Sequence, residues 1–201
     1  YYLSQMQNDL ISDSLFLSQI AEDLENRLPV IQALLEELHK ENNQESFNKV
    51  FREYVNTIFV PLYFVSNKAT YNEMESSAKL GIIRDKELRN KIVALYNHLE
   101  ITKNIFSVNY EFMQPVDADL IYGKGIAKYQ KNQDRLFLPY ISEGEIYKFK
   151  DLRFELESNA ANWNWTIVDM QPAVESQLKE LGIVLARINT YLNEAKFAFY
   201  F

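Results

Sequence analysis

The residues of this chain best suited to chemistry are its two histidines and the carboxylates near them. Glu36 and His39 have the Glu-x-x-His spacing that places two metal ligands on one face of a helix. Helical bundles that bind two iron ions use a pair of such motifs together with further Glu residues. His98 has Leu95 in the corresponding position, so the second motif is missing. We therefore expect an exposed polar helix face here and no metal site.

Other catalytic patterns are also incomplete. Gly123-Lys-Gly125 lacks the length and the Ser or Thr of a phosphate-binding loop. There is no Gly-x-Ser-x-Gly motif, and the absence of Cys excludes disulfides, thiolate metal sites and a cysteine nucleophile. Asp and Glu are numerous enough for a carboxylate pair of the glycosidase kind, but acidic helix faces in an acidic protein explain them more simply. The sequence therefore predicts no enzyme, no catalytic residue and no cofactor.

A small-molecule site between helices is a second possibility for this chain. Trp163 and Trp165 lie among Asn159, Asn162 and Asn164, and the chain holds 13 Tyr and 13 Phe. Aromatic walls with a few amides are typical of ligand pockets. Trp163 falls on an apolar stripe, which predicts a core residue, whereas Trp165 is expected at the surface. A sensory bundle that binds a small ligand is the alternative function that these residues support.

Composition limits the remaining classes of protein. The 201 residues are 47% hydrophobic and 24% charged, with five Gly and five Pro, which suits one helical domain over residues 1–201. The net charge of −7 and the lack of a Lys/Arg block argue against nucleic-acid binding. No stretch approaches the about 20 apolar residues of a membrane span.

Apolar residues recur at alternating steps of three and four in long stretches of the chain, the spacing of helices that bury one face against other helices. The first stripe is Leu17, Ile20, Leu24, Leu28, Ile31, Leu35 and Leu38. This pattern predicts an all-α fold, an elongated antiparallel bundle with long helices at about 2–40, 86–113 and 143–195 and shorter packed helices. Prolines 29, 115 and 172 are expected to bend these helices or, at 115, to end one.

Three local features of the chain are open to more than one interpretation. Asp13 interrupts the first apolar stripe, either as a solvated helix end or as a paired polar residue that sets the register. The sequence at 59–65 predicts a buried connection, with a short strand or a partner-binding patch as the alternatives. The aromatic tail at 197–201 is expected either to dock on the bundle or to contact a partner.

Capping signals divide the rest of the chain. Ser46 is expected to cap the second helix of the chain. Asp85 is expected to cap the long helix that begins at Lys86. Thr70-Tyr-Asn-Glu73 has the capping-box pattern of a short helix that ends at Gly81, after which Ile82 and Ile83 pack inward. Ser142-Glu-Gly-Glu145 is a second match to this pattern.

The segment from Thr70 to Arg89 resembles a bacterial family known only as a domain of unknown function. The family signature has Thr-Tyr, Leu, a small pair such as Ser-Gly, Leu-x-x-Ile and Leu-Arg. Met74 and Ala78 stand where Leu and Gly are commoner. The family-signature positions, of unknown role, are Thr70, Tyr71, Glu73, Ser77, Leu80, Ile83, Leu88 and Arg89.

This resemblance implies where the domain works. Residues 1–10 are similar to the family's first soluble helix, which follows one N-terminal membrane helix. The resemblance therefore implies a membrane anchor ahead of this chain and a domain on the periplasmic side of a bacterial membrane. It transfers no catalytic residues. The expected function is that of a non-enzymatic, membrane-tethered helical domain that acts through contacts with an unknown protein partner.

Overall fold

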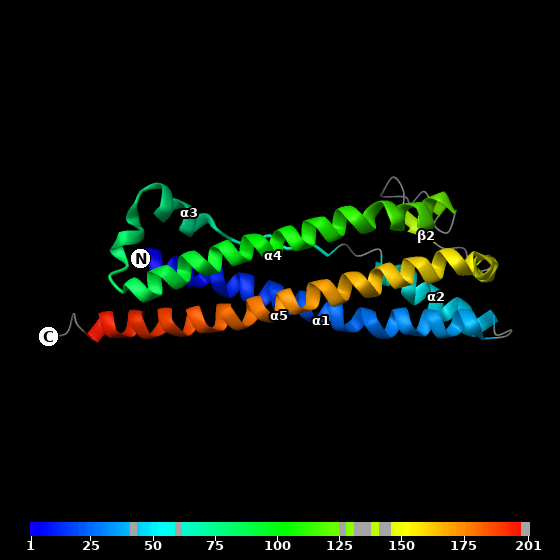
Figure 1. Cartoon of the computed structure of the whole chain (residues 1–201), viewed down its shortest axis with the longest axis horizontal. Coiled ribbons are helices and arrows are strands. Elements are labelled where there is room, and N and C mark those ends of the chain that lie inside the picture. Colours follow the sequence, from blue (N-terminus) through cyan, green and yellow to red (C-terminus); the bar gives the residue numbers. More distant parts are fainter. Residues whose placement is uncertain (41–43, 59–61, 125–127, 131–137, 141–145, 198–201) are drawn as a thin grey trace. The chain divides into compact units, whose positions relative to one another are not determined.

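The computed structural model describes the backbone of residues 1–40, 44–58, 62–124, 128–130, 138–140 and 146–197. These residues form a helical bundle with one short hairpin, which confirms the predicted all-α class (Figure 1). The elements are α1 Tyr2–His39, α2 Gln44–Ile58, α3 Ala69–Ser76, η1 Lys79–Ile82, α4 Lys86–Ala118, the π-helical turn η2 Asp119–Gly123, β1 Lys128–Gln130, β2 Leu138–Tyr140, η3 Ile146–Leu152 and α5 Arg153–Phe197. Strands β1 and β2 pair antiparallel, with Tyr129 opposite Pro139.

The chain divides into two compact units. Unit 1 comprises residues 1–22, 63–107 and 170–201, and unit 2 comprises residues 23–62 and 108–169. Helices α1, α4 and α5 each contribute a stretch to both units, and α2 lies in unit 2. The expectation of one domain over residues 1–201 stays a prediction.

The three long helices match the sequence analysis in number and order but not at every boundary. Helix α1 agrees with the predicted range, whereas α4 continues through Pro115 to Ala118, so the predicted end near residue 113 is wrong. Helix α5 begins at Arg153, ten residues later than the expected start at 143. Pro29, Pro115 and Pro172 are all exposed, so water can bond the carbonyl that each proline leaves without its helical partner. A bend at these prolines stays a prediction.

In unit 1, α4 and α5 run antiparallel around an apolar core. Polar pairs mark their register: Arg187 NH2 lies 2.8 Å from Asp85 Oδ2, and Thr102 Oγ1 donates to Gln177 Oε1 over 3.2 Å. The core consists of fully buried residues from all three long helices, which include Met6, Leu10, Leu17, Leu88, Ile92, Leu95, Leu99, Phe106, Val174, Leu181 and Ile188.

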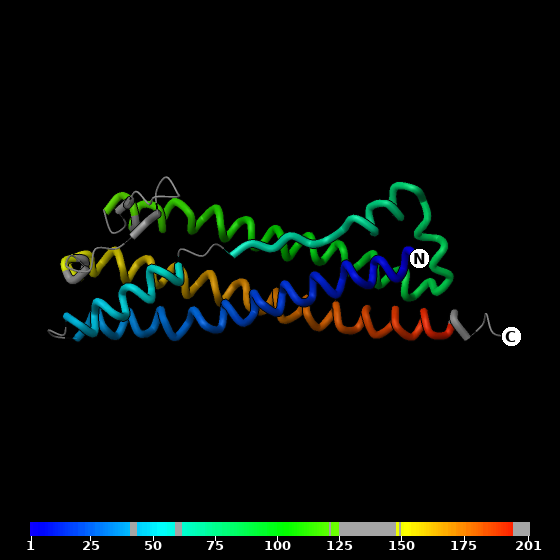
Figure 2. Tube along the Cα trace, turned by 180° about the vertical axis from the view of Figure 1, so that it is seen from behind, coloured from blue at the N-terminus to red at the C-terminus, as the bar shows by residue number. Residues whose placement is uncertain are grey.

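An extended segment, residues 63–68, leads into α3 and is the straight stretch ahead of that helix in Figure 2. Phe64 is 2% exposed, and its ring centroid lies 5.9 Å from Phe16 and 6.4 Å from Phe106. Tyr63 and Val65 point outward, because successive side chains of an extended chain face opposite sides. The expected burial is therefore confirmed for Phe64 and wrong for its two neighbours; residues 59–61 lie outside the described residues.

The entry to α3 differs from the predicted capping box. The helix begins at Ala69, and Lys68 is its N-cap residue. The Lys68 side chain makes no capping hydrogen bond to the helix. The assignment of Thr70 as the cap is therefore wrong. Carboxylates of α1 bind this stretch instead: Asp13 Oδ1 accepts from the Asn67 N–H, just ahead of the N-cap residue, over 2.8 Å. Asp9 Oδ2 accepts from the Thr70 N–H over 3.4 Å. Asp13 is therefore the paired polar residue on the stripe, and a tertiary carboxylate replaces the local cap.

The exit from α3 is also different from the prediction. The helix ends at Ser76, and Ala78, not Gly81, takes the left-handed conformation, with φ of 56°. Ile83 is buried as expected, but Ile82 is 61% exposed, so its predicted inward packing is wrong. The predicted cap of the next helix is confirmed, because the Leu88 N–H donates to Asp85 Oδ1 over 3.0 Å.

Unit 2 is built on the buried side of α2 together with stretches of α1, α4 and α5. The structure starts α2 at Gln44, so Ser46 is not its cap residue. The second capping-box match, residues 142–145, lies outside the described residues. The unit 2 core includes Leu24, Ile31, Leu34, Phe47, Phe51, Tyr54, Val55, Met113, Leu120, Leu156, Trp163 and Ile167.

Candidate functional site

A buried polar network forms around Asp117, near the C-terminal end of α4. Asn159 Nδ2 and Trp163 Nε1, both from α5, donate to Asp117 Oδ1 over 2.9 Å each. The Tyr54 hydroxyl on α2 donates in turn to Asn159 Oδ1. Burial raises the pKa of Asp117 to about 6, although its two hydrogen bonds and the charge of Arg27 act in the opposite direction.

Arg27 joins α1 to this network. Its side chain is 1% exposed, and Nε and NH2 donate to Asp23 Oδ2 over 3.2 and 3.0 Å. The guanidinium carbon lies 4.9 Å from the centroid of the Trp163 ring, a cation–π contact. The network therefore links α1, α2, α4 and α5 within unit 2. Asp117 can hold a proton near neutral pH, but its bonded partners are side chains that pack the unit.

Replacement of Asp117 by Asn tests the state of this carboxylate. Asn keeps the oxygen that accepts from Asn159 and Trp163 but removes the negative charge of this half-buried side chain. Because the folded pKa of about 6 exceeds the usual unfolded value of about 3.9, the wild type loses stability as the pH rises from about 4 through 6. We expect Asp117→Asn to be more stable than the wild type at pH 7.5, by about 2 kcal/mol or less.

Denaturant unfolding between pH 4 and pH 8 measures this difference. The gain should shrink as the pH falls through 6, because the wild-type carboxyl then binds its proton. Asp119→Asn, two residues further along and exposed, is the matched control and should follow the wild type. An advantage of Asp117→Asn that does not change with pH would contradict the assignment.

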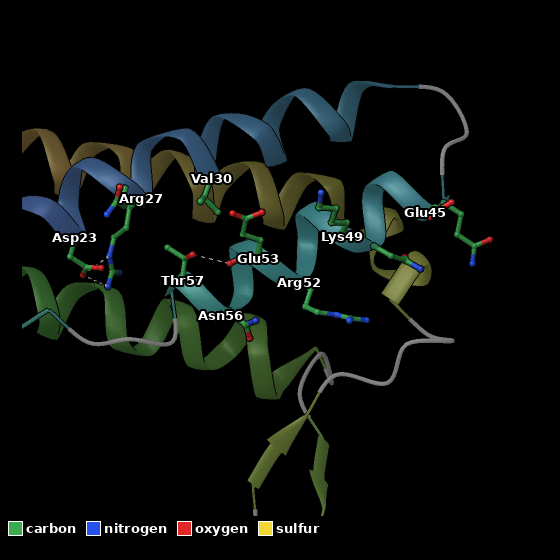
Figure 3. A pocket seen from close by; sticks show the side chains of 12 residues that line it. Asp23, Arg27, Val30, Glu45, Lys49, Arg52, Glu53, Asn56 and Thr57 are labelled. Carbon is green, nitrogen blue, oxygen red and sulfur yellow. Dashed lines mark hydrogen bonds and ion pairs between the residues drawn. The ribbon is translucent and has the colours of Figure 1, made fainter.

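A polar groove lies between α1 and α2 in unit 2 (Figure 3). Its volume is about 1210 Å³, and Figure 3 shows Asp23 and Arg27 on α1 opposite Glu53 and Thr57 on α2. Lysine, arginine and carboxylate side chains alternate along α2 with amides, so neither charge dominates the lining. The lining residues are Asp23, Asn26, Arg27, Val30, Gln44, Glu45, Asn48, Lys49, Arg52, Glu53, Asn56 and Thr57.

Large apolar side chains are exposed on the unit 2 stretches of α4 and α5. Val108 and Phe112 on α4 are 65% and 46% exposed, and Trp165 and Val168 on α5 are 61% and 60% exposed. The Phe112 and Trp165 rings meet edge to face with centroids 6.4 Å apart. Asn109 Nδ2, which donates to Asp169 Oδ2 over 3.1 Å, joins the two helices beside them. We call Val108, Phe112, Trp165 and Val168 the outer apolar face.

The family-signature positions serve the fold of unit 1. Tyr71 stacks on Tyr96 with ring centroids 4.2 Å apart, and Glu73 Oε1 accepts from the Tyr2 hydroxyl over 2.8 Å. Ser77 Oγ donates to the carbonyl of Glu73 over 2.6 Å. Thr70, Tyr71, Ile83 and Leu88 are buried, Leu80 and Arg89 are half-buried, and Glu73 and Ser77 are exposed. These residues do not converge on one site.

The two histidines lie on helix surfaces beside carboxylates. His39 Nε2 is 3.4 Å from Glu157 Oε1, and His98 Nδ1 is 2.7 Å from Glu180 Oε2. Glu36 is exposed and does not share these contacts. Within the part of the chain that the structure describes, no group of three or more His, Asp or Glu residues is arranged to hold a metal ion.

Sequence reasoning placed the two tryptophans correctly but missed the network between Trp163 and α1. Trp163 is 4% exposed and Trp165 is 61% exposed, as expected. Arg27 occupies a stripe position between Leu24 and Ile31 and is buried, whereas the predicted stripe residue Leu28 is half-buried. Arg27 stands three residues after Leu24 and four before Ile31, and this spacing was the sequence signal for its burial.

Comparison with protein families, with curated proteins and with solved structures finds no match to this chain. None of the described helices combines the length and the apolar character that a membrane crossing needs. The family resemblance of residues 70–89 and the membrane anchor therefore stay predictions.

Proposed function

We propose that this protein is a non-enzymatic interaction domain that binds a partner protein through the outer apolar face of unit 2. The observation that carries the proposal is the exposure of four large apolar side chains on neighbouring turns of α4 and α5. Contiguous exposed apolar side chains are typical of binding surfaces, and tryptophan is enriched among the residues that dominate binding energy. The edge-to-face contact of Phe112 with Trp165 makes the two helices one continuous surface.

The location of the domain is the second part of the proposal. The resemblance of residues 70–89 to the membrane-tethered bacterial family supports a periplasmic position behind an N-terminal anchor. Fractionation of cells that express the complete gene product tests this. Recovery in the membrane fraction, with the domain open to external protease in spheroplasts, is expected; recovery with the cytoplasmic proteins would contradict it.

Site-specific photo-crosslinking in cells tests the interaction surface. A photoreactive amino acid at position 112 or 165 should give a discrete adduct of higher mass, identified by mass spectrometry as one protein. The same probe at position 183, an exposed α5 site in unit 1, is the matched control and should give no adduct. Equal labelling at all three positions, or none at any, would overturn the proposed surface.

A small ligand in the polar groove between α1 and α2 is the second candidate function. The groove's volume and its many amide and charged groups favour it. A bound metabolite should raise the melting temperature of the wild type, because it binds the folded state alone. The shift should be lost in Asn56→Leu. A metabolite screen without any shift would count against a sensory bundle.

A further inference from the structure

We propose that the outer apolar face binds a basic amphipathic helix. This inference rests on the proposed function and adds the chemistry of the partner. It depends on three features of unit 2, which are the spacing of the exposed residues, a cleft beside them and the charges around them.

The exposed residues follow helical spacing on both helices. On α5, Phe154, Ala161, Trp165 and Val168 are all exposed and stand at steps of seven, four and three. On α4, Val108 and Phe112 are four residues apart. Two such antiparallel stripes, side by side, offer the ridges and groove in which a third helix packs. Recognition of a helix by a hydrophobic groove uses anchors at this spacing.

A cleft at the Phe154 end of α5 is suited to an anchor side chain. Its volume is about 180 Å³, and Val116, Leu120 and Phe154 form its apolar walls. Pockets that hold whole drug-sized ligands start at about 300 Å³, so this cleft suits a single side chain better than a free ligand. Val116 stands four residues after Phe112 on α4, which places the cleft on the side of that helix that carries Phe112.

The stretches of α4 and α5 that carry the face are acidic. Residues 104–123 contain no Lys or Arg, and neither do residues 154–169. Asp119 and Asp169 are exposed within these stretches. Lys124, beyond the first of them, lies 3.5 Å from Glu155 in an ion pair. An apolar strip with acidic borders is complementary to a helix that carries Lys or Arg beside its apolar face.

A second copy of this chain is a poorer occupant. A symmetric dimer through this surface would place the same patch on both sides of the interface. Asp119 and Asp169 of one subunit would then approach the same acidic residues of the other. Like charges across an interface disfavour association.

Peptide binding to the full-length chain tests the proposal. The probe is a fluorescent helical peptide of about 18 residues, which makes five turns, with Leu at three- and four-residue steps and Lys elsewhere. A peptide with Glu in place of every Lys is its control. Fluorescence anisotropy should show saturable binding of the Lys peptide, weakening as salt is raised, and at least about tenfold weaker binding of the Glu peptide.

Three variants locate the bound peptide. Phe112→Ala combined with Trp165→Ala should weaken binding of the Lys peptide about tenfold or more, whereas Ile183→Ala in unit 1 should leave it unchanged. Asp119→Asn combined with Asp169→Asn should weaken binding and reduce its salt dependence. Circular dichroism checks that each variant keeps its helices. Equal binding of both peptides, or binding that the Phe112/Trp165 variant leaves intact, would overturn the basic-helix inference.

The two proposals fail differently. A crosslinked partner at positions 112 and 165 together with no preference for the Lys peptide would leave the interaction surface in place and remove the basic helix. No crosslink and no peptide binding would remove both.

Discussion

Phe64→Ala should lower the free energy of unfolding by about 4 kcal/mol, in the range found when a buried Phe is truncated. The Phe64 side chain is 2% exposed and lies between the Phe16 and Phe106 rings, so its loss removes both contacts and leaves a cavity. Residues 63–67 lie outside any helix, and Phe64 and Asp13 attach them to the helices. Urea unfolding followed by circular dichroism measures the effect.

Val65→Ala is the matched control for this prediction. The next residue along the same segment is 60% exposed, so its truncation should change stability by no more than about 0.5 kcal/mol. Equal effects of the two substitutions would mean that the segment does not pack as the structure shows.

Arg27→Ala should lower the free energy of unfolding by about 3 kcal/mol, in the range found when a large buried side chain is truncated to Ala. Arg27 is among the largest fully buried side chains, and its truncation removes the bonds to Asp23 and the contact with Trp163. The loss of its positive charge should also raise the pKa of Asp117 further, because that charge lowers it in the wild type.

Two further variants separate charge from volume at this position. Arg27→Met fills more of the space without a charge and should be less destabilising than Arg27→Ala. Arg52→Ala removes an exposed arginine of the same groove and should change stability by about 0.5 kcal/mol at most. Chemical unfolding at pH 7.5 compares them. If Arg27→Ala proved as mild as Arg52→Ala, the network would not hold unit 2 together.

The long helices could be predicted because their apolar residues recur at steps of three and four. The ends of the helices were harder to predict, because the groups that cap them can come from distant parts of the chain. Asp85 is a local cap, three residues from the N–H that it accepts, and the sequence predicted it correctly. Thr70 matched a capping box, but Asp9 of α1 accepts from the Thr70 N–H, and Asp13 accepts from the Asn67 N–H just ahead of the helix. Nothing in residues 66–73 alone shows that two carboxylates about 60 positions earlier approach them.

The candidate site was less predictable than the fold. Trp163 and Trp165 were assigned to core and surface from their position on a stripe, and both assignments are confirmed. Arg27 was missed because Leu28, its neighbour, also fits helical spacing, and a Leu is the expected core residue. Asp117 was missed because it lies past Pro115, where the sequence analysis expected the helix to end. Val108 and Phe112 are exposed because the other helices cover a different face of α4. The spacing of apolar residues in the sequence does not show which face that is.

Both tryptophans of the chain lie in unit 2, one in the core and one at the surface. Intrinsic tryptophan fluorescence is therefore a signal from unit 2 alone, whereas circular dichroism at 222 nm averages over every helix. With Trp165→Phe, the remaining emission reports the surroundings of Trp163 beside Arg27; with Trp163→Phe, it reports the outer apolar face. If the two units unfold at different denaturant concentrations, the fluorescence and dichroism midpoints will differ, and the protein carries this pair of optical probes without any added label.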